Sequence, residues 1–376
     1  CYAESKDGIV FEKPDLHLFE VNGDSKNNVV LADHAPYSHN FAPFPNVRPG
    51  APDNEKYLAI AGTKKTGLSI FASEAGLRWR MLHEGVITDG AFDSQNVAFW
   101  SSKEKCYVCY YRTWSGGGYD GYRWVSRSVS DDLKTWSAGE VMTAGGAPPE
   151  HIYVNQTVSY FRAPHIYIAL AARFMPGRQV VTSEQAESLG VEAGYFKDCS
   201  DNVLMTSRGG NDYDRRFMEG FVRPGIGLES WTSRTNYPAQ GIVATGEKEV
   251  SFYIQQNYGQ PTGHLDRYTL RMDGFASLRA GYEGGHFITK PLQFTGKALS
   301  INFSTSAAGY VRVAILDVNG RVIPGFSDQE SDEVIGNMIE RIVHWNGESD
   351  IGALENEAIR LKFVLKDADI FSLQFK

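Results

Sequence analysis

The chain has 376 residues, 42% of them hydrophobic and 22% charged, a composition typical of a folded globular protein and not of a disordered chain. Its 37 basic and 45 acidic residues give a net charge of −8, the wrong sign for a protein that binds the phosphate backbone of a nucleic acid. No segment approaches the roughly 20 consecutive apolar residues that a membrane helix needs. We therefore expect no nucleic-acid partner and no membrane span.

A short phrase recurs along the first three quarters of the chain. In each copy, a short strand ends at Ser or Thr, a polar turn that usually contains Gly follows, and an aromatic residue comes soon after the turn. With 38 glycines and 12% aromatic residues, the sequence favours many short strands joined by tight turns. Repeats roughly 60 to 80 residues apart are typical of the four-stranded blades of a β-propeller. The copies are Tyr2–Phe11, Phe71–Trp79, Ser128–Trp136, Thr206–Tyr213 and a degenerate one at Arg271.

After each copy come an apolar strand, a polar turn and a second apolar strand, which we interpret as the two inner strands of the next blade. The first pair is NFAPF and KYLAIAG, and the last is AQGIVAT and EVSFYIQQ. Because a copy of the phrase stands at Tyr2, we expect the chain to begin at the last strand of a blade. The first blade would then be incomplete, and residues before Cys1 would supply its missing strands. A single short helix is expected within residues 180–196, with Ser183 as its N-cap.

From about Gly285 the chain alternates apolar and polar residues, the pattern of half-buried strands. Hairpin turns separate these strands, and Asn319-Gly320 favours a type I′ turn. We therefore predict an all-β protein with a five-bladed propeller over residues 1–284 and a jelly-roll-like β-sandwich over residues 285–376.

Two cysteines, Cys106 and Cys109, lie in the strand-like run CYVCYYRT. Residues three apart on a strand point to opposite faces, so we predict two packed thiols and not a zinc or redox pair. No spacing of His and Asp indicates a transition metal. No cofactor is predicted, and a structural calcium ion at the propeller axis is left open.

In a propeller blade, the start of the innermost strand and the end of its partner reach the same face. Polar residues occupy these positions here and suggest a site for a neutral sugar, which needs fixed hydrogen-bonding groups and aromatic faces. The alternative is that these side chains only satisfy strand ends and buried water. The candidate substrate-binding residues are Asn40, Gln95, Asn96, Arg112, Trp114, Asn155, Arg173, Arg234, Asn236, Tyr237 and Tyr258.

Hydrolysis of a glycosidic bond normally needs two carboxyl groups on opposite sides of the bond. Asp93, which precedes an inner strand in FDSQN, is the first candidate, and Glu150 in PPEHIYVN is the second. His39 precedes the strand NFAPF and is a third candidate for the acid. The alternatives are a turn-capping Asp93, a solvated loop carboxylate at Glu150 and a structural His39 bonded between blades.

Blade endings such as SVSDDLKTW, followed by the tail from Ser304, resemble the five-bladed glycoside hydrolases of families 32, 43, 68 and 117. The resemblance implies a hydrolase of plant or algal oligosaccharides with acid/base catalysis in an axial pocket. Because axial pockets in propellers favour chain ends, we expect an exo mode. We expect an extracellular or periplasmic location, with the cytoplasm left open. Some members use a histidine as general acid, which His39 would match. These families place a catalytic Asp on the innermost strand of their first blade, which has no counterpart here. A non-catalytic glycan-binding propeller and an interaction scaffold are therefore the alternatives, and the oligomeric state is left open.

Overall fold

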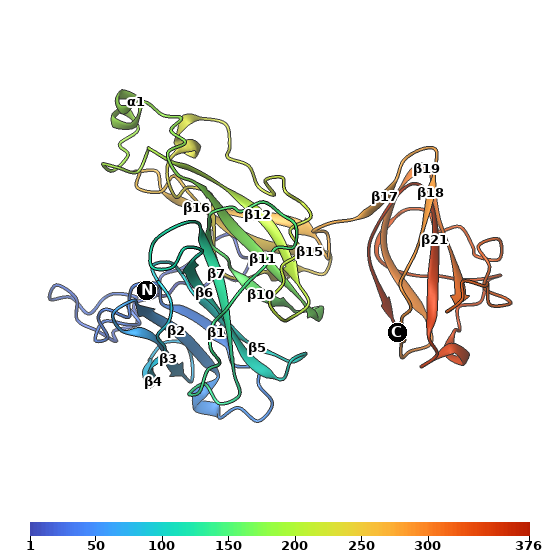
Figure 1. Ribbon diagram of the computed structural model, residues 1–376, viewed down its shortest axis with the longest axis horizontal. Coiled ribbons are helices and arrows are strands. Elements are labelled where there is room, and N and C mark those ends of the chain that lie inside the picture. Colours follow the sequence, from blue (N-terminus) through green and yellow to red (C-terminus); the bar gives the residue numbers. More distant parts are fainter. The chain divides into compact units, whose positions relative to one another are not determined.

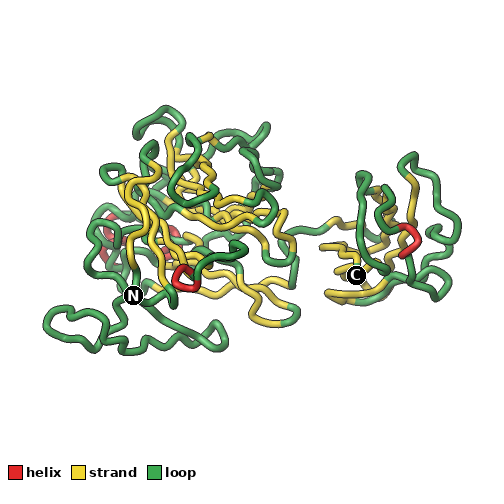
Figure 2. The backbone as a smooth tube through the Cα atoms, turned by 90° about the horizontal axis from the view of Figure 1, so that it is seen from below, coloured by secondary structure: helices red, strands yellow, loops and turns green.

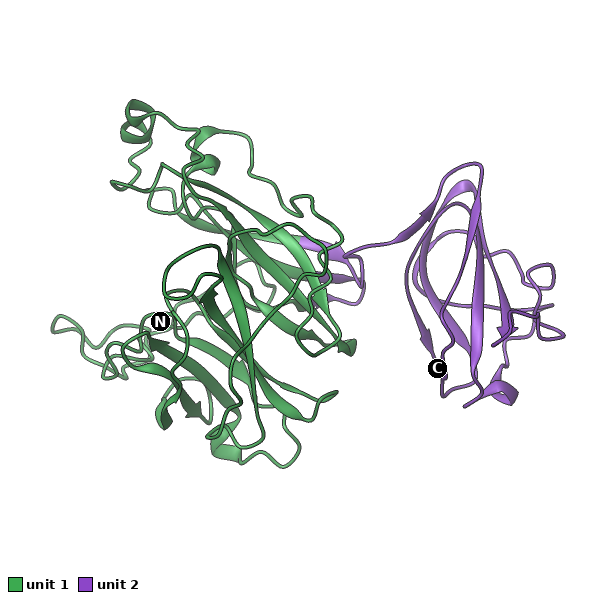
Figure 3. Ribbon diagram, viewed as in Figure 1, with its two compact units in different colours: residues 1–243, 251–268 green, residues 244–250, 269–376 purple.

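A computed structural model describes residues 1–376, and strands dominate it (Figure 2). The chain forms two compact units, one of residues 1–243 with 251–268 and one of residues 244–250 with 269–376 (Figure 3). Its one α-helix is α1, Ser183–Ser188, and the other helical turns are the short 3-10 segments η1, Asp53–Glu55, η2, Leu228–Trp231, and η3, Gly352–Leu354. The all-β prediction is confirmed.

Four four-stranded sheets follow one another along residues 42–271 (Figure 1). The first two have the strand orders β1-β2-β3-β4 and β5-β6-β7-β8. In the third, β9 and β10 both pair with β11, which pairs with β12, and in the fourth, β13, β14 and β16 all pair with β15. This repetition is consistent with a propeller-like fold.

The strands of the first two sheets are β1 Ala42–Pro45, β2 Tyr57–Thr63, β3 Gly67–Ser73, β4 Arg80–Ile87, β5 Val97–Ser101, β6 Cys106–Trp114, β7 Arg123–Ser130 and β8 Glu140–Val141. Those of the next two are β9 Ile152–Val154, β10 Thr157–Tyr160, β11 Ala163–Met175, β12 Cys199–Ser207, β13 Tyr237–Pro238, β14 Val243–Gly246, β15 Glu249–Gln256 and β16 His264–Arg271.

Neighbouring sheets pack face to face, as alternate residues of β6 demonstrate. Tyr107 and Cys109 belong to a core shared with the first sheet, whereas Cys106, Val108 and Tyr110 belong to a core shared with the third. Both faces of the strand are therefore buried, which explains its nearly continuous apolar sequence. The prediction that Cys106 and Cys109 point to opposite faces is confirmed.

Three copies of the recurring phrase, at Ser5, Ser73 and Ser130, form one turn with the same hydrogen bond. In the copy after β7, the hydroxyl of Ser130 accepts a hydrogen bond from the backbone N–H of Leu133 at 2.9 Å. Leu133 has φ of +67°, and its carbonyl accepts a bond from the indole of Trp136 at 2.9 Å. The carboxylate of Asp132 accepts backbone N–H groups from Lys134 and Thr135. The same hydroxyl-to-amide bond joins Ser5 to Gly8 and Ser73 to Gly76, at 2.9 Å in both copies.

The chain does not begin with the last strand of a blade, because no strand precedes β1. The first copy of the phrase forms its turn, but its backbone pairs with no strand: it has an isolated bridge between Glu4 and Glu12 and a hydrogen bond from the N–H of Tyr2 to the carbonyl of Asn28. The turn packs on β15 instead. The hydroxyl of Tyr253 donates to the carbonyl of Gly8 at 2.7 Å, and the ring of Phe11 meets that of Tyr253 edge-on at 5.9 Å.

The second unit contains one five-stranded sheet in which β21 pairs with β17, β18 and β19, and β19 pairs with β20. The predicted two-sheet sandwich is not shown. The two alternating segments ALSINFSTS and YVRVAILD form the single strand β19, with a register shift between Thr305 and Tyr310, and β21 is nearly as long. The strands are β17 Leu278–Ala280, β18 Gly285–Ile288, β19 Leu299–Asp317, β20 Asn337–Ile342 and β21 Ile359–Phe375.

Two local predictions are corrected. The N-cap of α1 is Thr182, not Ser183, and it forms a capping box with Gln185. In the turn after β19, Gly320 has φ of +84° but Asn319 is not left-handed, so the turn is not type I′. The carboxylate of Asp317 accepts the backbone N–H of Asn319, which fixes a different turn.

Candidate functional site

A cavity of about 540 Å³ lies among the N-terminal segment and the second, third and fourth sheets. Half of the sequence-predicted site residues line it, and they come from segments nearly 220 residues apart in the chain. Gln156, which follows the candidate Asn155, also lines the cavity, and so do Tyr153 and Gln255, which the sequence analysis missed. Tyr153 lies in β9, and Gln156 stands between β9 and β10. The predicted residues at the cavity are His39, Asn40, Asp93, Gln95, Arg234, Tyr237 and Tyr258.

A left-handed backbone residue precedes three of the inner strands. Asn40 before β1 has φ of +59°, Gln156 before β10 has +42°, and Asn236 before β13 has +69°. This conformation is uncommon for residues other than glycine, although Asn adopts it most readily. The sharp change of direction brings Asn40 and Gln156 to the cavity wall as their strands begin.

Asp93 faces the cavity with a buried cation beside it. The guanidinium Nη1 of Arg112 lies 3.1 Å from Oδ1 of Asp93, and the side chain of Arg112 is 1% exposed against 36% for Asp93. Arg112 also donates to the carbonyl of Tyr153 and lies 4.6 Å from the centre of that ring. Burial lowers the pKa of Arg112, but an arginine stays charged in proteins. Arg112 itself does not line the cavity and instead positions Asp93 and Tyr153.

The imidazole of His39 is exposed at the cavity and makes no hydrogen bond within the chain. It therefore differs from the histidine bonded between blades that the structural alternative predicts. An imidazole in this state is available to exchange a proton with a ligand.

Several polar atoms at the cavity are buried without a partner. They are Nδ2 of Asn40, Oε1 of Gln156 and the hydroxyl of Tyr237. Burial raises the pKa of Tyr237 well above its ordinary value, so this hydroxyl keeps its proton and can donate a hydrogen bond. An unpaired buried polar atom costs about 1–3 kcal/mol. These atoms are therefore suited to hydrogen bonds with a ligand rich in hydroxyl groups.

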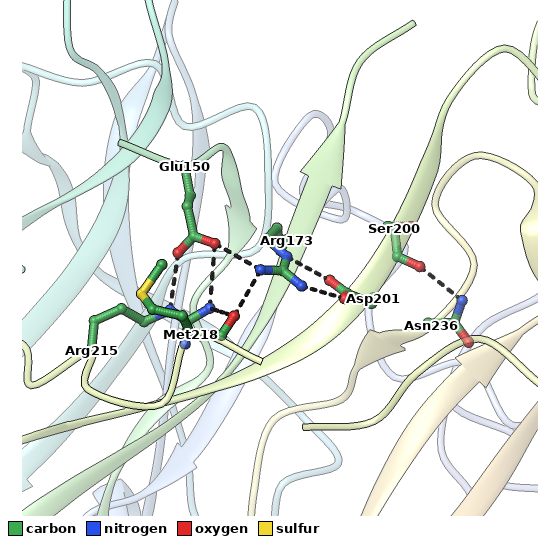
Figure 4. Close-up of polar contacts among 7 residues, drawn as sticks. All are labelled: Glu150, Arg173, Ser200, Asp201, Arg215, Met218 and Asn236. Atoms are coloured by element: carbon green, nitrogen blue, oxygen red, sulfur yellow. Dashed lines mark hydrogen bonds and ion pairs between the residues drawn. The ribbon is translucent and has the colours of Figure 1, made fainter. Parts of the chain in front are cut away.

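Glu150 and Arg173 line a separate cavity of about 890 Å³ and do not line the one that contains Asp93. Figure 4 shows Glu150 between two guanidinium groups, at 2.9 Å from Nη1 of Arg173 and 3.0 Å from Nε of Arg215. Arg173 also binds both carboxylate oxygens of Asp201 in β12, at 2.9 and 2.6 Å. The hydrogen bonds to Asp201 and, to a smaller extent, to Glu150 raise the pKa of Arg173. This is a network of matched charges, not a solvated loop carboxylate.

The other candidates bond to the backbone or pack away from the cavity, as the strand-end alternative predicts. Oδ1 of Asn96 accepts the N–H of Arg112 at 3.0 Å, and Oδ1 of Asn155 accepts that of Thr157 at 3.1 Å. Nδ2 of Asn236 donates to the carbonyl of Ser200 at 2.9 Å, which is also drawn in Figure 4. The ring of Trp114 lies under the guanidinium of Arg123, at 4.5 Å.

No group of three or more His, Cys, Asp or Glu side chains gathers in the geometry of a metal site. None of the helices has both the length and the apolar character needed to cross a membrane.

The chain matches no family model and no curated protein. Among solved structures it is similar to a glycoside hydrolase, with a TM-score of 0.44 and 12% identity over 74% of this chain and 79% of that one. A family 43 arabinoxylan arabinofuranohydrolase from Bacillus subtilis matches with a TM-score of 0.33 and 10% identity over 85% and 76%. An exo-β-1,3-galactanase from Phanerochaete chrysosporium matches with a TM-score of 0.30 and 8% identity over 88% and 95%.

Proposed function

We propose that this protein is a glycoside hydrolase that binds the end of an oligosaccharide in the 540 Å³ cavity. The observation that carries the proposal is that Asp93 and His39 line the same cavity, together with unpaired amide and hydroxyl groups. The volume lies in the range of sites that enclose small ligands, which suits a chain end better than a long groove does.

In this proposal His39 protonates the leaving glycosidic oxygen and Asp93 acts as the base or nucleophile. Arg112 keeps the carboxylate of Asp93 in place, and Gln156 and Tyr237 bind sugar hydroxyls. We further propose that the four sheets belong to a five-bladed propeller with the cavity on its axis. The substrates would be plant or algal oligosaccharides, met outside the cytoplasm.

A glycan-binding protein without catalysis is the second candidate, and one observation favours it. Asp93 is the only carboxylate that lines the cavity, whereas hydrolysis normally uses two. In that case Asp93 would serve as a hydrogen-bond acceptor for sugar hydroxyls.

The two candidates are separated by incubating the protein with a panel of plant and algal oligosaccharides and analysing the products by chromatography. We expect the unaltered chain to release short sugars from chain ends. Asp93→Asn and His39→Gln should lower the rate at least about 100-fold, the size of a general acid or base contribution, while sugar binding persists. Asp131→Asn, an exposed carboxylate beside the turn after β7, is the control and should keep full activity.

Binding without turnover at any pH would establish the glycan-binding candidate. Cleavage only in the middle of chains would contradict the exo mode and leave hydrolysis intact. Turnover that Asp93→Asn and His39→Gln leave unchanged would remove the proposed mechanism.

A further inference from the structure

Arginines gather around the ring of Tyr153, which lines this cavity, although the chain as a whole carries a net charge of −8. Three guanidinium groups surround the ring of Tyr153, with Arg112, Arg123 and Arg234 at 4.6, 5.5 and 5.9 Å from its centre. Only Arg112 has a carboxylate partner, Asp93. Burial lowers the pKa of His151, whose ring accepts the backbone N–H of Arg123, and the charges of Arg123 and Arg112 lower it further. Around the ring of Tyr153 there are therefore three guanidinium groups and one carboxylate, and of these charged groups Arg234 and Asp93 line the cavity.

Of the three arginines, Arg234 is the one that lines the cavity. Its guanidinium lies 4.6 Å from the ring centre of Tyr195 and 5.7 Å from that of Tyr258. Its backbone has φ of +61°, in the left-handed region that a long side chain rarely adopts. The aromatic faces hold the cation in one place but supply no negative charge. No carboxylate of the chain forms an ion pair with it.

A guanidinium that is partly desolvated and has no anionic partner is favourable when a ligand supplies the anion. Its planar array of N–H donors matches two oxygens of a carboxylate or of a sulfate. A wholly neutral sugar would cover this cation without pairing it, which costs free energy. The unpaired guanidinium thus favours a charged ligand over the neutral sugar that the polar residues alone suggest.

We propose that the ligand of this cavity is an acidic sugar whose anionic group binds Arg234. This inference rests on the proposed function, because it assumes that the cavity binds carbohydrate. The anionic group is either the carboxylate of a uronic acid or a sulfate ester, which offer the guanidinium the same pair of oxygens. A role for Arg234 in packing against the tyrosines alone would give no preference for charged ligands.

The test compares matched ligands by calorimetry. An oligogalacturonide is paired with the same oligomer after carboxyl reduction, and a sulfated algal oligosaccharide with its desulfated form. We expect the full chain to bind one acidic member about 10- to 100-fold more tightly than its neutral partner, the range for a charge-assisted hydrogen-bonded pair. If the oligogalacturonide pair gives this ratio, the bound anion is a carboxylate. If the sulfated pair gives it, the bound anion is a sulfate.

Arg234→Gln should reduce that ratio to near one, because affinity for the acidic ligand falls far more than affinity for its neutral partner. Arg234→Lys keeps the charge but not the two-pronged geometry, so it should keep part of the ratio. Arg208→Gln removes an exposed arginine that does not line the cavity and should leave the ratio unchanged. Thermal unfolding of each variant checks that it is folded.

The outcomes separate the two proposals. Equal affinity for charged and neutral partners, or a preference that survives Arg234→Gln, overturns the acidic-sugar inference and leaves the cavity as a carbohydrate site. Failure of every acidic and neutral sugar to bind the unaltered chain overturns both the inference and the proposed function.

Discussion

The buried guanidinium of Arg112 lies 3.1 Å from the carboxylate of Asp93, which is partly open to solvent. The pair joins β6 to the loop that precedes β5, and through the carbonyl of Tyr153 it also reaches β9 in the next sheet. Two adjacent sheets are therefore joined beside the cavity by one cation. The stability of the fold and the position of the proposed catalytic carboxylate depend on the same ion pair.

A double-mutant cycle should detect this coupling. Asp93→Asn leaves the buried Arg112 without its anion, and we expect a loss of about 1–3 kcal/mol in the free energy of unfolding, less than for a fully buried pair because Asp93 is partly exposed. Arg112→Met removes the cation, and the double variant should lose about 1–2 kcal/mol less than the sum of the single losses. Urea denaturation of the unaltered chain, the two single variants and the double variant measures the four free energies of unfolding. Strict additivity would mean that the pair contributes nothing.

Glu150→Gln should reduce stability and not catalysis. The substitution removes the anion between Arg173 and Arg215, and the side chain of Arg215 is only 1% exposed, so we expect a loss of about 2–4 kcal/mol in the free energy of unfolding. The rate per folded molecule, or the sugar affinity if the protein is not an enzyme, should stay within about twofold.

Denaturant unfolding and the oligosaccharide assay are measured on the same preparation of the Glu150→Gln variant. A fall in rate of about 100-fold in a variant that remains fully folded would return Glu150 to the catalytic machinery. Such a fall would also imply that the cavity lined by Glu150, and not the cavity lined by Asp93, holds the reacting bond.

The turn after β7 predicts a specific dependence of stability on pH. Backbone N–H groups of Thr135 and Lys134 lower the pKa of Asp132 from 3.8 to about 2. Because the folded-state pKa lies below the unfolded value, the stabilisation is complete above about pH 4 and is lost as the pH falls toward 2. The stability difference between the unaltered chain and Asp132→Asn should therefore shrink across that interval.

Thermal unfolding followed from pH 5 to pH 2 measures this difference. The neighbouring Asp131 makes no such bonds, so Asp131→Asn is the matched control and should follow the unaltered chain. A stability difference for Asp132→Asn that stays constant between pH 4 and pH 2 would show that the amide bonds do not depend on the charge of the carboxylate.

The repeat pattern could be predicted from the sequence because each copy of the turn is local. Ser130, Leu133 and Trp136 interact within seven consecutive residues, so their spacing is enough to identify the turn. The starts of the inner strands could be placed for the same reason, and they brought Asn40 and Asp93 to the cavity.

The features that the sequence analysis missed depend on contacts between residues that lie far apart in the chain. Glu150 resembles a loop carboxylate until Arg173 and Arg215 are brought to it by the third sheet and the segment after β12. The first copy of the phrase has the same local pattern as the others but no strand beside it to pair with, so it forms a turn without a blade. In β19, only the pairing with β21 reveals that two strand patterns form one strand.

Two buried tyrosines allow a role in ligand binding to be separated from a role in folding. The hydroxyl of Tyr237 is buried at the cavity without a partner, whereas that of Tyr213 shares a hydrogen bond of 2.6 Å with Thr157. Tyr237→Phe removes an unsatisfied polar group, so the free energy of unfolding should stay equal or rise by up to about 1 kcal/mol. Tyr213→Phe leaves the Thr157 hydroxyl unpaired and should lower it by about 1–2 kcal/mol.

For sugar affinity, Tyr237→Phe should have the larger effect of the two substitutions. If the hydroxyl of Tyr237 bonds to a ligand, Tyr237→Phe weakens sugar binding about 5- to 10-fold, the cost of one hydrogen bond, while Tyr213→Phe leaves binding unchanged because its hydroxyl lies in the core between the second and third sheets. Denaturation and calorimetry on both variants provide the comparison. A Tyr237→Phe variant that is destabilised as much as Tyr213→Phe, and that binds sugar normally, would mean that the unpaired hydroxyl serves the fold. The cavity would then lack one of the groups on which its assignment to carbohydrate depends.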